Sequence, residues 1–192
     1  MTDANCPWCG SEPVYVAYHD EEWGVPEWDS RALWEKLVLD GFQAGLSWIT
    51  ILKKRDNFRS AFAGFQPEIL ASWGEPEVAR LLTDPGIIRH RGKIEATIGN
   101  ARAYLAIQDR AGFADFLWKY LNHAPQQNRF SRDQIPTETA TSQAMSKALK
   151  KAGFGFCGST ITYAFMQATG LVNDHLTTCH AHDRIAALAS RE

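Results

Sequence analysis

The chain carries Asp40-Gly41-Phe42-Gln43-Ala44-Gly45-Leu46-Ser47-Trp48 between two apolar segments, and this stretch decides how the rest of the fold is arranged. On both sides of it, apolar residues recur at intervals of three and four. That spacing predicts one buried helix over 31–42, capped by Asp29, and a second over about 47–62. The glycines between them predict a sharp turn that another surface can approach closely.

Two interpretations of this stretch are open from its residues alone. Trp48 can belong to the core of an ordinary corner between two helices. Alternatively, Trp48 forms the aromatic floor of a pocket and Asp40 its negatively charged wall, while the Gly45-Leu46 turn projects into whatever binds there. The residue types found elsewhere in the chain favour the pocket.

Length and composition indicate one domain spanning 1–192. The chain is 45% hydrophobic, and it contains no apolar run near the roughly eighteen residues of a membrane span. Its first residues are polar and lack the basic and apolar regions of a secretory signal, so we expect a cytoplasmic protein without a membrane partner. In that reducing compartment the four cysteines are expected to be thiols or metal ligands rather than disulfides.

The basic residues are clustered, although the formal charge of −2 gives no overall preference for nucleic acid. Each cluster alone is usually a solvated face, whereas three together could line one groove. The clusters are Lys53-Lys54-Arg55 with Arg59, Arg89-His90-Arg91 with Lys93, and Lys147 with Lys150 and Lys151.

The remaining pattern predicts further helices and no sheet, so the expected fold class is all-α. Residues 1–28 have little helical period and are dense in Cys, Trp, Tyr, Pro and His. We therefore expect no helix with a buried face there, and expect packing or a metal to hold the segment. Residues 122–141 are rich in Pro, Ser, Thr and Gln and predict a long surface loop. Helices are expected from Pro67, at about 77–83, from Lys93 to about 107, and at 113–121, 142–152 and 159–169.

A helix, a glycine-containing turn and a second helix follow one another over about 77–107, with cationic residues at the turn. The first turn of a helix has free backbone N–H groups that suit a phosphate oxygen. The segment therefore predicts a hairpin at Gly86–Lys93 that binds a nucleic-acid backbone, and it also fits a plain connection between helices.

His175 and Cys179 are four residues apart, so on a helix they would share one face and hold one metal ion. The other group of ligand-type residues lies near the N-terminus, at Cys6, Cys9 and His19. Cys6 and His19 would complete a closed Cys₂His₂ set, which is typical of structural zinc.

A zinc ion held in this way would join the irregular segment 1–28 to the segment 170–182 and stabilise both. Cys9 competes with Cys6 for one position, because Cys-x-x-Cys is itself ligand spacing. A chain without metal is the alternative. Cys157 lies between phenylalanines and is expected to be a buried thiol.

Four runs of the sequence closely resemble the DNA-3-methyladenine glycosylase I family of the helix-hairpin-helix superfamily. Their length and unusual composition make the resemblance specific, and it extends from about Cys6 to Cys179. The runs are YVAYHDEEWGVP at 15–26, QAGLSWITILKKR at 43–55, GIIRHRGKI at 86–94 and GLVNDH at 170–175.

The resemblance implies an all-α helix-hairpin-helix glycosylase fold with a small zinc-binding region formed by both termini. It implies a bacterial base-excision repair enzyme that flips 3-methyladenine out of alkylated double-stranded DNA and hydrolyses its bond to the sugar. We also expect a monomer that needs no protein partner. Structural zinc is expected on Cys6, His19, His175 and Cys179, so the family pattern selects Cys6 over Cys9.

The resemblance also implies roles for individual residues. Asp40 and Tyr18 are expected to be catalytic, and Trp48, Tyr15 and Trp8 to surround the extruded base. Contacts to DNA are expected from a wedge at Gly45 and Leu46, and from Gly86, Arg89, Arg91 and Lys93.

One residue departs from the family pattern. Members usually carry a glutamate where this chain has Asp40, and that glutamate hydrogen-bonds the methylated adenine. Aspartate keeps the charge but is one methylene shorter. Either the helix sits closer to the base, or a water fills the gap, or selectivity is looser.

The chemistry of the expected substrate suits these residues. 3-Methyladenine in DNA is cationic, so a carboxylate favours it over neutral adenine, and the charge weakens the bond between base and sugar. Nothing in the sequence places Lys93 in the pocket as a Schiff-base nucleophile, so we expect a monofunctional enzyme without lyase activity.

Two other functions compete with this one. One is a DNA-binding module that is held together by zinc and has no catalytic activity. Such a module needs no pocket, so Asp40 and Trp48 would have no function in it. A zinc hydrolase would need an open coordination position, which four protein ligands do not leave.

Overall fold

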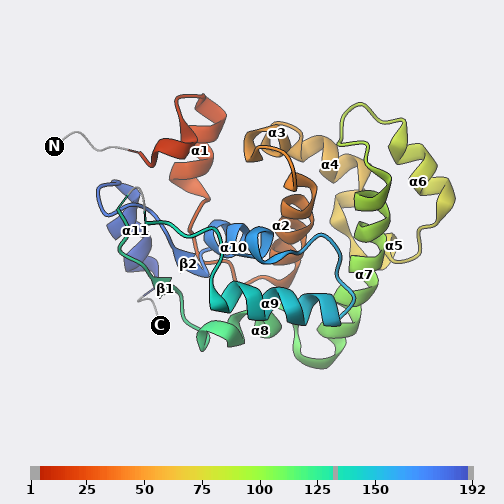
Figure 1. Ribbon diagram of the computed structural model, residues 1–192. Helices are drawn as coiled ribbons and strands as arrows, with labels where there is room; N and C mark the ends of the chain where they lie inside the picture. Colours follow the sequence, from red (N-terminus) through yellow and green to blue (C-terminus); the bar gives the residue numbers. More distant parts are fainter. Residues whose placement is uncertain (1–4, 132–133, 190–192) are drawn as a thin grey trace.

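The computed structural model describes residues 5–131 and 134–189, and these residues form a mainly helical assembly (Figure 1). The α-helices are α1 (Pro13–Glu21), α2 (Ser30–Gln43), α3 (Trp48–Leu52), α4 (Arg55–Ala61), α5 (Pro67–Leu70), α6 (Glu75–Leu82), α7 (Arg91–Ala111), α8 (Phe113–Trp118), α9 (Ala140–Lys151), α10 (Ser159–Ala168) and α11 (Ala181–Leu188). Short 3-10 helices are η1 (Pro7–Cys9), η2 (Ala63–Phe65) and η3 (Lys119–Leu121), and the strands are β1 (Gln126–Gln127) and β2 (Val172–Asn173).

Helix α2 is the element around which the others pack, and it contacts α3, α7, α8 and α10. Its start is capped as predicted, because Asp29 Oδ1 accepts from the amides of Arg31 and Ala32 at 2.9 and 2.8 Å. Gly41 lies inside this helix rather than in the turn. A Cβ there would come within 3.3 Å of Phe156, so this glycine allows close packing.

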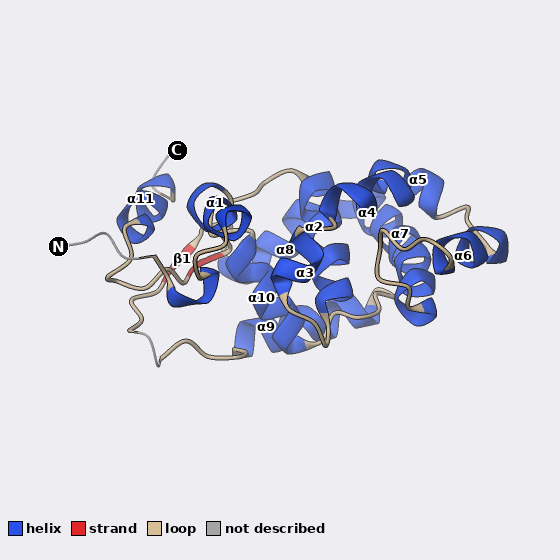
Figure 2. Ribbon diagram, turned by 90° about the horizontal axis from the view of Figure 1, so that it is seen from above, coloured by secondary structure: helices blue, strands red, loops and turns tan. Residues whose placement is uncertain are grey.

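The elements from the two ends of the chain lie together. Helices α1 and α11 lie at one end of the molecule and α5 and α6 at the other, in both views (Figures 1 and 2). His180, just before α11, pairs with Asp20 of α1 across a distance of 3.2 Å. The long helix α7 packs against α2, α5, α6 and α8.

The prediction of one helix over 47–62 is wrong, because the chain breaks at Lys53 and Lys54 into α3 and α4. Lys54 Nζ donates to the carbonyl of Pro85 at 2.9 Å and to that of Gly86 at 3.3 Å. The break therefore ties this corner to the hairpin between α6 and α7, a contact that local spacing does not report.

The prediction that residues 1–28 contain no helix with a buried face is also wrong. Pro13 opens α1, in the first position that proline favours, and the helix buries Tyr18 and His19. Its buried face consists of aromatic and imidazole rings rather than an aliphatic stripe, so the hydrophobic period is weak in the sequence.

The expected absence of a sheet fails at one place. Gln126 and Gln127 of the predicted loop 122–141 pair in parallel with Val172 and Asn173. Two residues per strand are too short for an alternating pattern. The sequence interpretation also did not predict helix α11.

The other predicted helices are present, with ends shifted by a few residues, and the helix, turn and helix expected over about 77–107 correspond to α6 and α7. The segment expected as a helix over 113–121 ends its α-helical part at Trp118 and continues as η3. Within the described ranges, no helix combines the length and apolar character needed to cross a bilayer.

Candidate functional site

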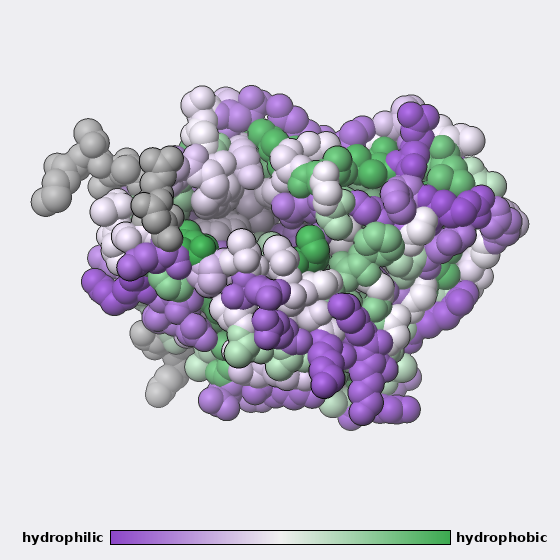
Figure 3. Space-filling model, in the orientation of Figure 1, coloured by the Kyte–Doolittle hydropathy of each residue, from purple (hydrophilic) through white to green (hydrophobic). Residues whose placement is uncertain are grey.

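A cavity of about 260 Å³ is lined by residues of α1, α2, α3 and α10, and the space-filling view is hollowed between α1 and α3 (Figure 3). Every residue that the sequence predicted for catalysis or base binding lies on its lining. The lining residues are Trp8, Tyr15, Tyr18, Trp23, Lys36, Asp40, Gln43, Trp48, Ile135, Ala164, Gln167 and Ala168.

Asp40 brings a buried carboxyl group from α2 to this cavity, and its side chain is only 1% exposed. Lys36 lies one helical turn earlier and pairs with Oδ1. Burial raises the pKa of the Asp40 carboxyl group, and Lys36 opposes that shift. The other oxygen, Oδ2, is buried without a hydrogen-bond partner among the described residues. An open buried acceptor costs free energy, so the arrangement suits a ligand that donates a hydrogen bond.

Lys36 is a cavity residue that the sequence interpretation missed. Its Nζ lies 3.8 Å from the centroid of the Trp48 ring, over the face of the indole. Burial lowers the pKa of this ammonium group, and Asp40 opposes that change. The sequence signal that would have shown the pair is the four-residue spacing of Lys36 and Asp40 on one helix.

Trp48, Trp8 and two tyrosines form the aromatic walls of the cavity. The ring centroids of Trp8 and Tyr15 are 5.1 Å apart, and those of Tyr18 and Trp48 are 5.4 Å apart. The indole Nε1 atoms of Trp8 and Trp48 are buried and have no partner in the described part of the chain. Burial raises the pKa of Tyr18 well above its ordinary value, so its phenol stays protonated at neutral pH. Flat walls with unused donors suit a planar heteroaromatic ligand.

The turn that follows α2 carries the predicted wedge. Gly45 has φ +81°, a conformation that glycine adopts without strain. Leu46 next to it is 42% exposed, although leucine is usually buried. The residues on either side of the turn, Gln43 and Trp48, both line the cavity. The turn with Gly45 and Leu46 therefore lies at the edge of the cavity.

Lys93 supports this turn from inside the protein. Its Nζ donates to the carbonyls of Phe42 at 2.8 Å and Ala44 at 2.6 Å, and the residue is 7% exposed. Burial lowers the pKa of its ammonium group. The expectation that Lys93 grips DNA directly does not match this geometry, in which the ammonium group is buried and bound to the backbone of the turn.

The hairpin between α6 and α7 holds Gly86 and Arg89, and Arg91 opens α7. Arg91 is committed to carboxylates, since its guanidinium lies 2.9 and 3.0 Å from Glu75 and 3.1 Å from Glu95. Arg89 is exposed and forms no ion pair with any residue that the structure describes. Of the three cationic residues predicted to contact DNA at the hairpin, Arg91 and Lys93 have partners, and only Arg89 forms no ion pair among the described residues.

The first of the three basic clusters has most of its charge paired with carboxylates, so it offers little free charge to a groove. Lys53 pairs with Glu12 at 3.0 Å, and Arg55 holds both oxygens of Glu22 at 2.5 and 2.9 Å. Arg59 likewise pairs with Glu35 at 2.7 Å. These side chains fasten the corner around α3 and α4 to α1 and α2.

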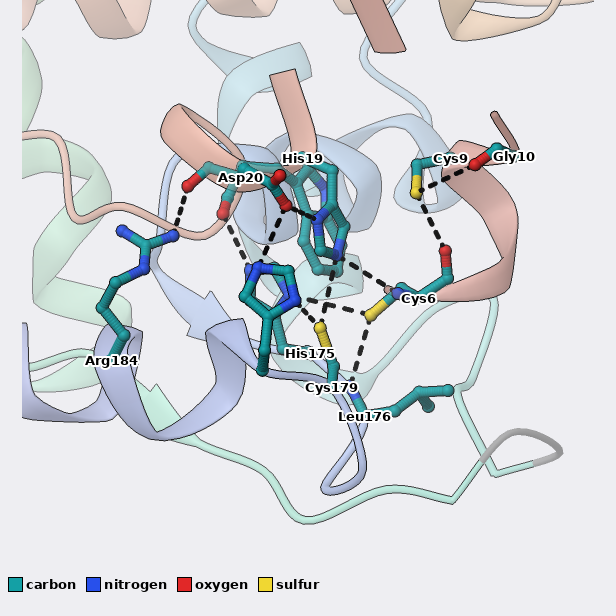
Figure 4. Close-up of polar contacts among 11 residues, drawn as sticks. Cys6, Cys9, Gly10, His19, Asp20, His175, Leu176, Cys179 and Arg184 are labelled. Carbon is teal, nitrogen blue, oxygen red and sulfur yellow. Dashed lines mark hydrogen bonds and ion pairs between the residues drawn. The ribbon is translucent and has the colours of Figure 1, made fainter. Parts of the chain in front are cut away.

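Cys6, His19, His175 and Cys179 come together from the two ends of the described chain, and all four are buried (Figure 4). Cys179 Sγ lies 3.4 Å from His19 Nε2 and 3.6 Å from His175 Nδ1, and Cys6 Sγ lies 3.7 Å from His175 Nδ1. Zinc with bonds of about 2.3 Å to sulfur and 2.0–2.1 Å to nitrogen needs separations of about 3.6 Å between these atoms at tetrahedral angles. The four residues fit such an ion.

The outer nitrogen atoms of both histidines are also engaged. His19 Nδ1 lies 2.7 Å from Asp20 Oδ1, and His175 Nε2 lies 3.0 Å from the carbonyl oxygen of Trp23. Such partners fix the orientation of metal-binding imidazoles. Hydrogen bonds, the largest from Cys6, lower the pKa of the Cys179 thiol and favour its thiolate form.

Two details of this cluster differ from the sequence argument. His175 and Cys179 do not share a helix, because the chain turns between them and the Cys179 amide donates to the Leu176 carbonyl at 2.8 Å. Cys9, the rival of Cys6, donates to the Cys6 carbonyl at 3.1 Å and lies outside the set (Figure 4).

Comparisons with known proteins agree with this geometry. A family model described as methyladenine glycosylase matches residues 8–182. The chain is 57% identical to DNA-3-methyladenine glycosylase 1 of Escherichia coli over 176 residues, which cover 91% of this chain and 94% of that protein. A crystal structure of 3-methyladenine DNA glycosylase I matches with a TM-score of 0.92 and 56% identity, covering 93% of this chain and 100% of the other. A variant of such an enzyme in complex with 3-methyladenine matches with a TM-score of 0.90 and 38% identity, covering 95% and 98% of the two chains. This chain therefore belongs to the methyladenine glycosylase family.

Proposed function

We propose that this chain is a DNA-3-methyladenine glycosylase that removes 3-methyladenine from alkylated double-stranded DNA, as a single domain without a protein partner. The relatives described above carry that name, and one similar structure is of a complex with 3-methyladenine. In this chain the proposal rests on the open oxygen of Asp40 beside Trp48 in the cavity. A cationic base that donates a hydrogen bond suits both groups.

Binding of a flipped base would draw on the aromatic walls. Extrusion of a base from the duplex costs a few kcal/mol, and stacking on an aromatic ring such as Trp48 contributes about 1–3 kcal/mol. A positive charge over a desolvated tryptophan adds up to about 2 kcal/mol. Neutral adenine would gain the stacking without the charge term, so the charge provides the discrimination.

The reaction needs little acid catalysis because the substrate base is already a cation. The bond between base and sugar breaks with its electron pair going to the base, which leaves as neutral 3-methyladenine. Water then bonds to the sugar carbon and loses a proton to solvent. Asp40 would hold the base through Oδ2, and Tyr18, as a protonated phenol, would act as a hydrogen-bond donor and not as a base.

We propose that the enzyme is monofunctional. A lyase step needs a free amine that attacks the sugar. Lys93 has its ammonium group bound by two carbonyls, and it is not among the residues that line the cavity. It is not available there as a nucleophile, which supports hydrolysis by water without strand cleavage.

A structural zinc ion on Cys6, His19, His175 and Cys179 is part of the proposal. The donor set and its atom separations support it. When bound, zinc would supply a crosslink between the two ends of the chain. Four protein ligands leave no position for substrate, so the chemistry would stay in the cavity.

The turn and the hairpin would position the DNA. Leu46, lifted by Gly45, would fill the gap that the extruded base leaves in the duplex. Arg89 and the backbone around Gly86 would hold the phosphates beside it, with the free amides at the start of α7 adding favourable dipoles.

The test is release of free bases from methylated duplex DNA, separated by chromatography, for the wild type and Asp40→Asn. Asp109→Asn, which changes an exposed carboxylate on α7, is the matched control. We expect the wild type and the control to release mainly 3-methyladenine. Asp40→Asn should be slower by on the order of a hundredfold, because it loses a preorganised charge.

The outcomes separate the activity from the residue. Equal release by the wild type and Asp40→Asn would remove Asp40 from the mechanism while the activity stands. No release by the wild type would refute the proposed function.

A further inference from the structure

Lys36 puts a cation where the proposed function expects the cationic base. Its ammonium group lies 3.8 Å from the Trp48 ring centroid and pairs with Asp40. These are the two groups that would receive 3-methyladenine. In the absence of a base, Lys36 therefore pairs with one oxygen of the carboxylate and covers the face of the indole.

Lys36 also borders a second cavity, of about 340 Å³, together with Tyr18 and Ala168, which line both cavities. Negative charge predominates in the second cavity. Besides Lys36, the charged side chains that line it are the carboxylates of Glu21, Glu22, Glu27 and Glu35 and the guanidinium groups of Arg55 and Arg59. When the Lys36 ammonium group leaves the first cavity, rotation of the Lys36 side chain can therefore bring it into the second cavity. The excess of carboxylates there would stabilise its positive charge.

We propose that Lys36 is a specificity-determining residue, whose ammonium group holds the place of the cationic base over Trp48 and moves toward the second cavity when the base enters. The inference rests on the proposed function and adds a mechanism of selection to it. A base with its own positive charge restores both contacts that Lys36 gives up. A neutral purine leaves the buried Asp40 carboxylate without a cation, and an uncompensated buried charge is strongly unfavourable.

Wild-type protein with ¹³C-labelled lysine side chains allows a direct test by nuclear magnetic resonance. Methylene protons over an indole face are shifted upfield by the ring current, so those of Lys36 should be upfield in the free protein. Their absence from the spectrum of Lys36→Met assigns them. Saturation with the 3,9-dimethyladeninium cation, in which a methyl group replaces the sugar so that the base stays positively charged, should abolish the upfield shift, because the base takes the ring face.

A lysine outside the cavity serves as the internal control. Lys119 Nζ lies 4.2 Å from the centroid of Phe116, so its resonances report a similar ring current. They should stay unchanged on addition of the 3,9-dimethyladeninium cation. Binding of this cation with an unchanged Lys36 shift would overturn the inference and leave the proposed function standing.

Affinity gives a second readout with a definite sign. Lys36→Met should bind the 3,9-dimethyladeninium cation more tightly, with a dissociation constant lower by on the order of tenfold, because no cation has to be displaced. A lysine that only kept Asp40 ionised would give weaker or unchanged binding in this variant, which would contradict the inference. Release of base from methylated DNA by the wild type, measured in parallel, distinguishes this failure from failure of the proposed function.

Discussion

The Cys–His cluster and the aromatic cavity are both assembled from distant parts of the chain. They differ in whether their buried polar atoms have partners. In the cluster, the donor atoms of Cys6, His19, His175 and Cys179 face one another, and the outer histidine nitrogens have partners. In the cavity, Asp40 Oδ2 and the indole nitrogens of Trp8 and Trp48 have none among the described residues.

Under the proposed function, this difference separates a group of residues that stabilises the fold from one that binds a ligand. An unpaired buried polar group costs about 1–3 kcal/mol. Several unpaired buried polar groups surround the cavity, whereas the described donor atoms of the neighbouring Cys–His cluster have partners. The contrast predicts that damage to the cluster reduces stability first, whereas damage to the cavity and its rim reduces activity with little change in stability.

The largest effect is expected from Cys6→Ser, which removes one ligand of the cluster. We expect loss of bound zinc and a fall of several kcal/mol in the free energy of unfolding, because metal binding to such a site is coupled to folding. Cys9→Ser is the matched control, since Cys9 lies three residues away and outside the set. It should keep its zinc and its melting temperature.

Metal analysis and thermal unfolding, with and without a chelator, check this prediction. Cys6→Ser with the zinc content of the wild type would show that the cluster does not hold the ion. Chelation that abolished base release without lowering the melting temperature would show instead that the cluster takes part in the activity and does not stabilise the fold.

A smaller effect is expected from Leu46→Ala at the rim of the cavity. Leu46 is exposed, so the free energy of unfolding should change by less than about 0.5 kcal/mol. Release of 3-methyladenine from duplex DNA should slow by roughly tenfold, which corresponds to about 1.4 kcal/mol of the barrier. Release from single-stranded DNA should not slow, because no gap has to be filled there.

Ile69→Ala is the control for this experiment, because Ile69 is a similarly exposed aliphatic residue at 40%, on α5. Its rates on both substrates should equal those of the wild type. Equal slowing of Leu46→Ala on duplex and single-stranded DNA would argue that Leu46 shapes the cavity and is not a wedge.

The smallest effect is expected at the hairpin, where two neighbouring arginines differ in their partners. Arg89→Gln should reduce the slope of log affinity for DNA against log salt concentration by about 0.9, the value of one phosphate contact. Arg91→Gln should reduce it less, because Glu75 and Glu95 already compensate Arg91. Titrations of alkylated duplex over a range of salt concentrations measure both slopes, and a larger change for Arg91→Gln would show that its ion pairs open on binding.

The helical spacing of apolar residues predicted most of the fold, and each of its failures has a specific physical cause. Apolar periodicity predicted α2, α7 and α10 because these helices bury one aliphatic or aromatic stripe. It failed at α1, whose buried face is made of polar rings, and at the break between α3 and α4, which is tied to a hairpin some thirty residues away. It also missed the two-residue strands, which are too short to carry a period.

The sequence by itself determined which residues are present, which of them are chemically able to act, and which family they resemble. The cysteines and histidines at both ends, the carboxylate at position 40 and the aromatic residues near it were all visible in this way. Their spacing was enough because ligand types and helix periods are local properties of a chain.

Tertiary structure alone decided which partners those residues use. It turned Cys9 away from the cluster, placed Lys93 under the Gly45 turn, and set Lys36 over Trp48. Each of these contacts depends on where a side chain lies relative to a neighbour on another element or at another turn. Burial and pairing are properties of the packed molecule, and local spacing restricts the face of a helix but not what packs against it.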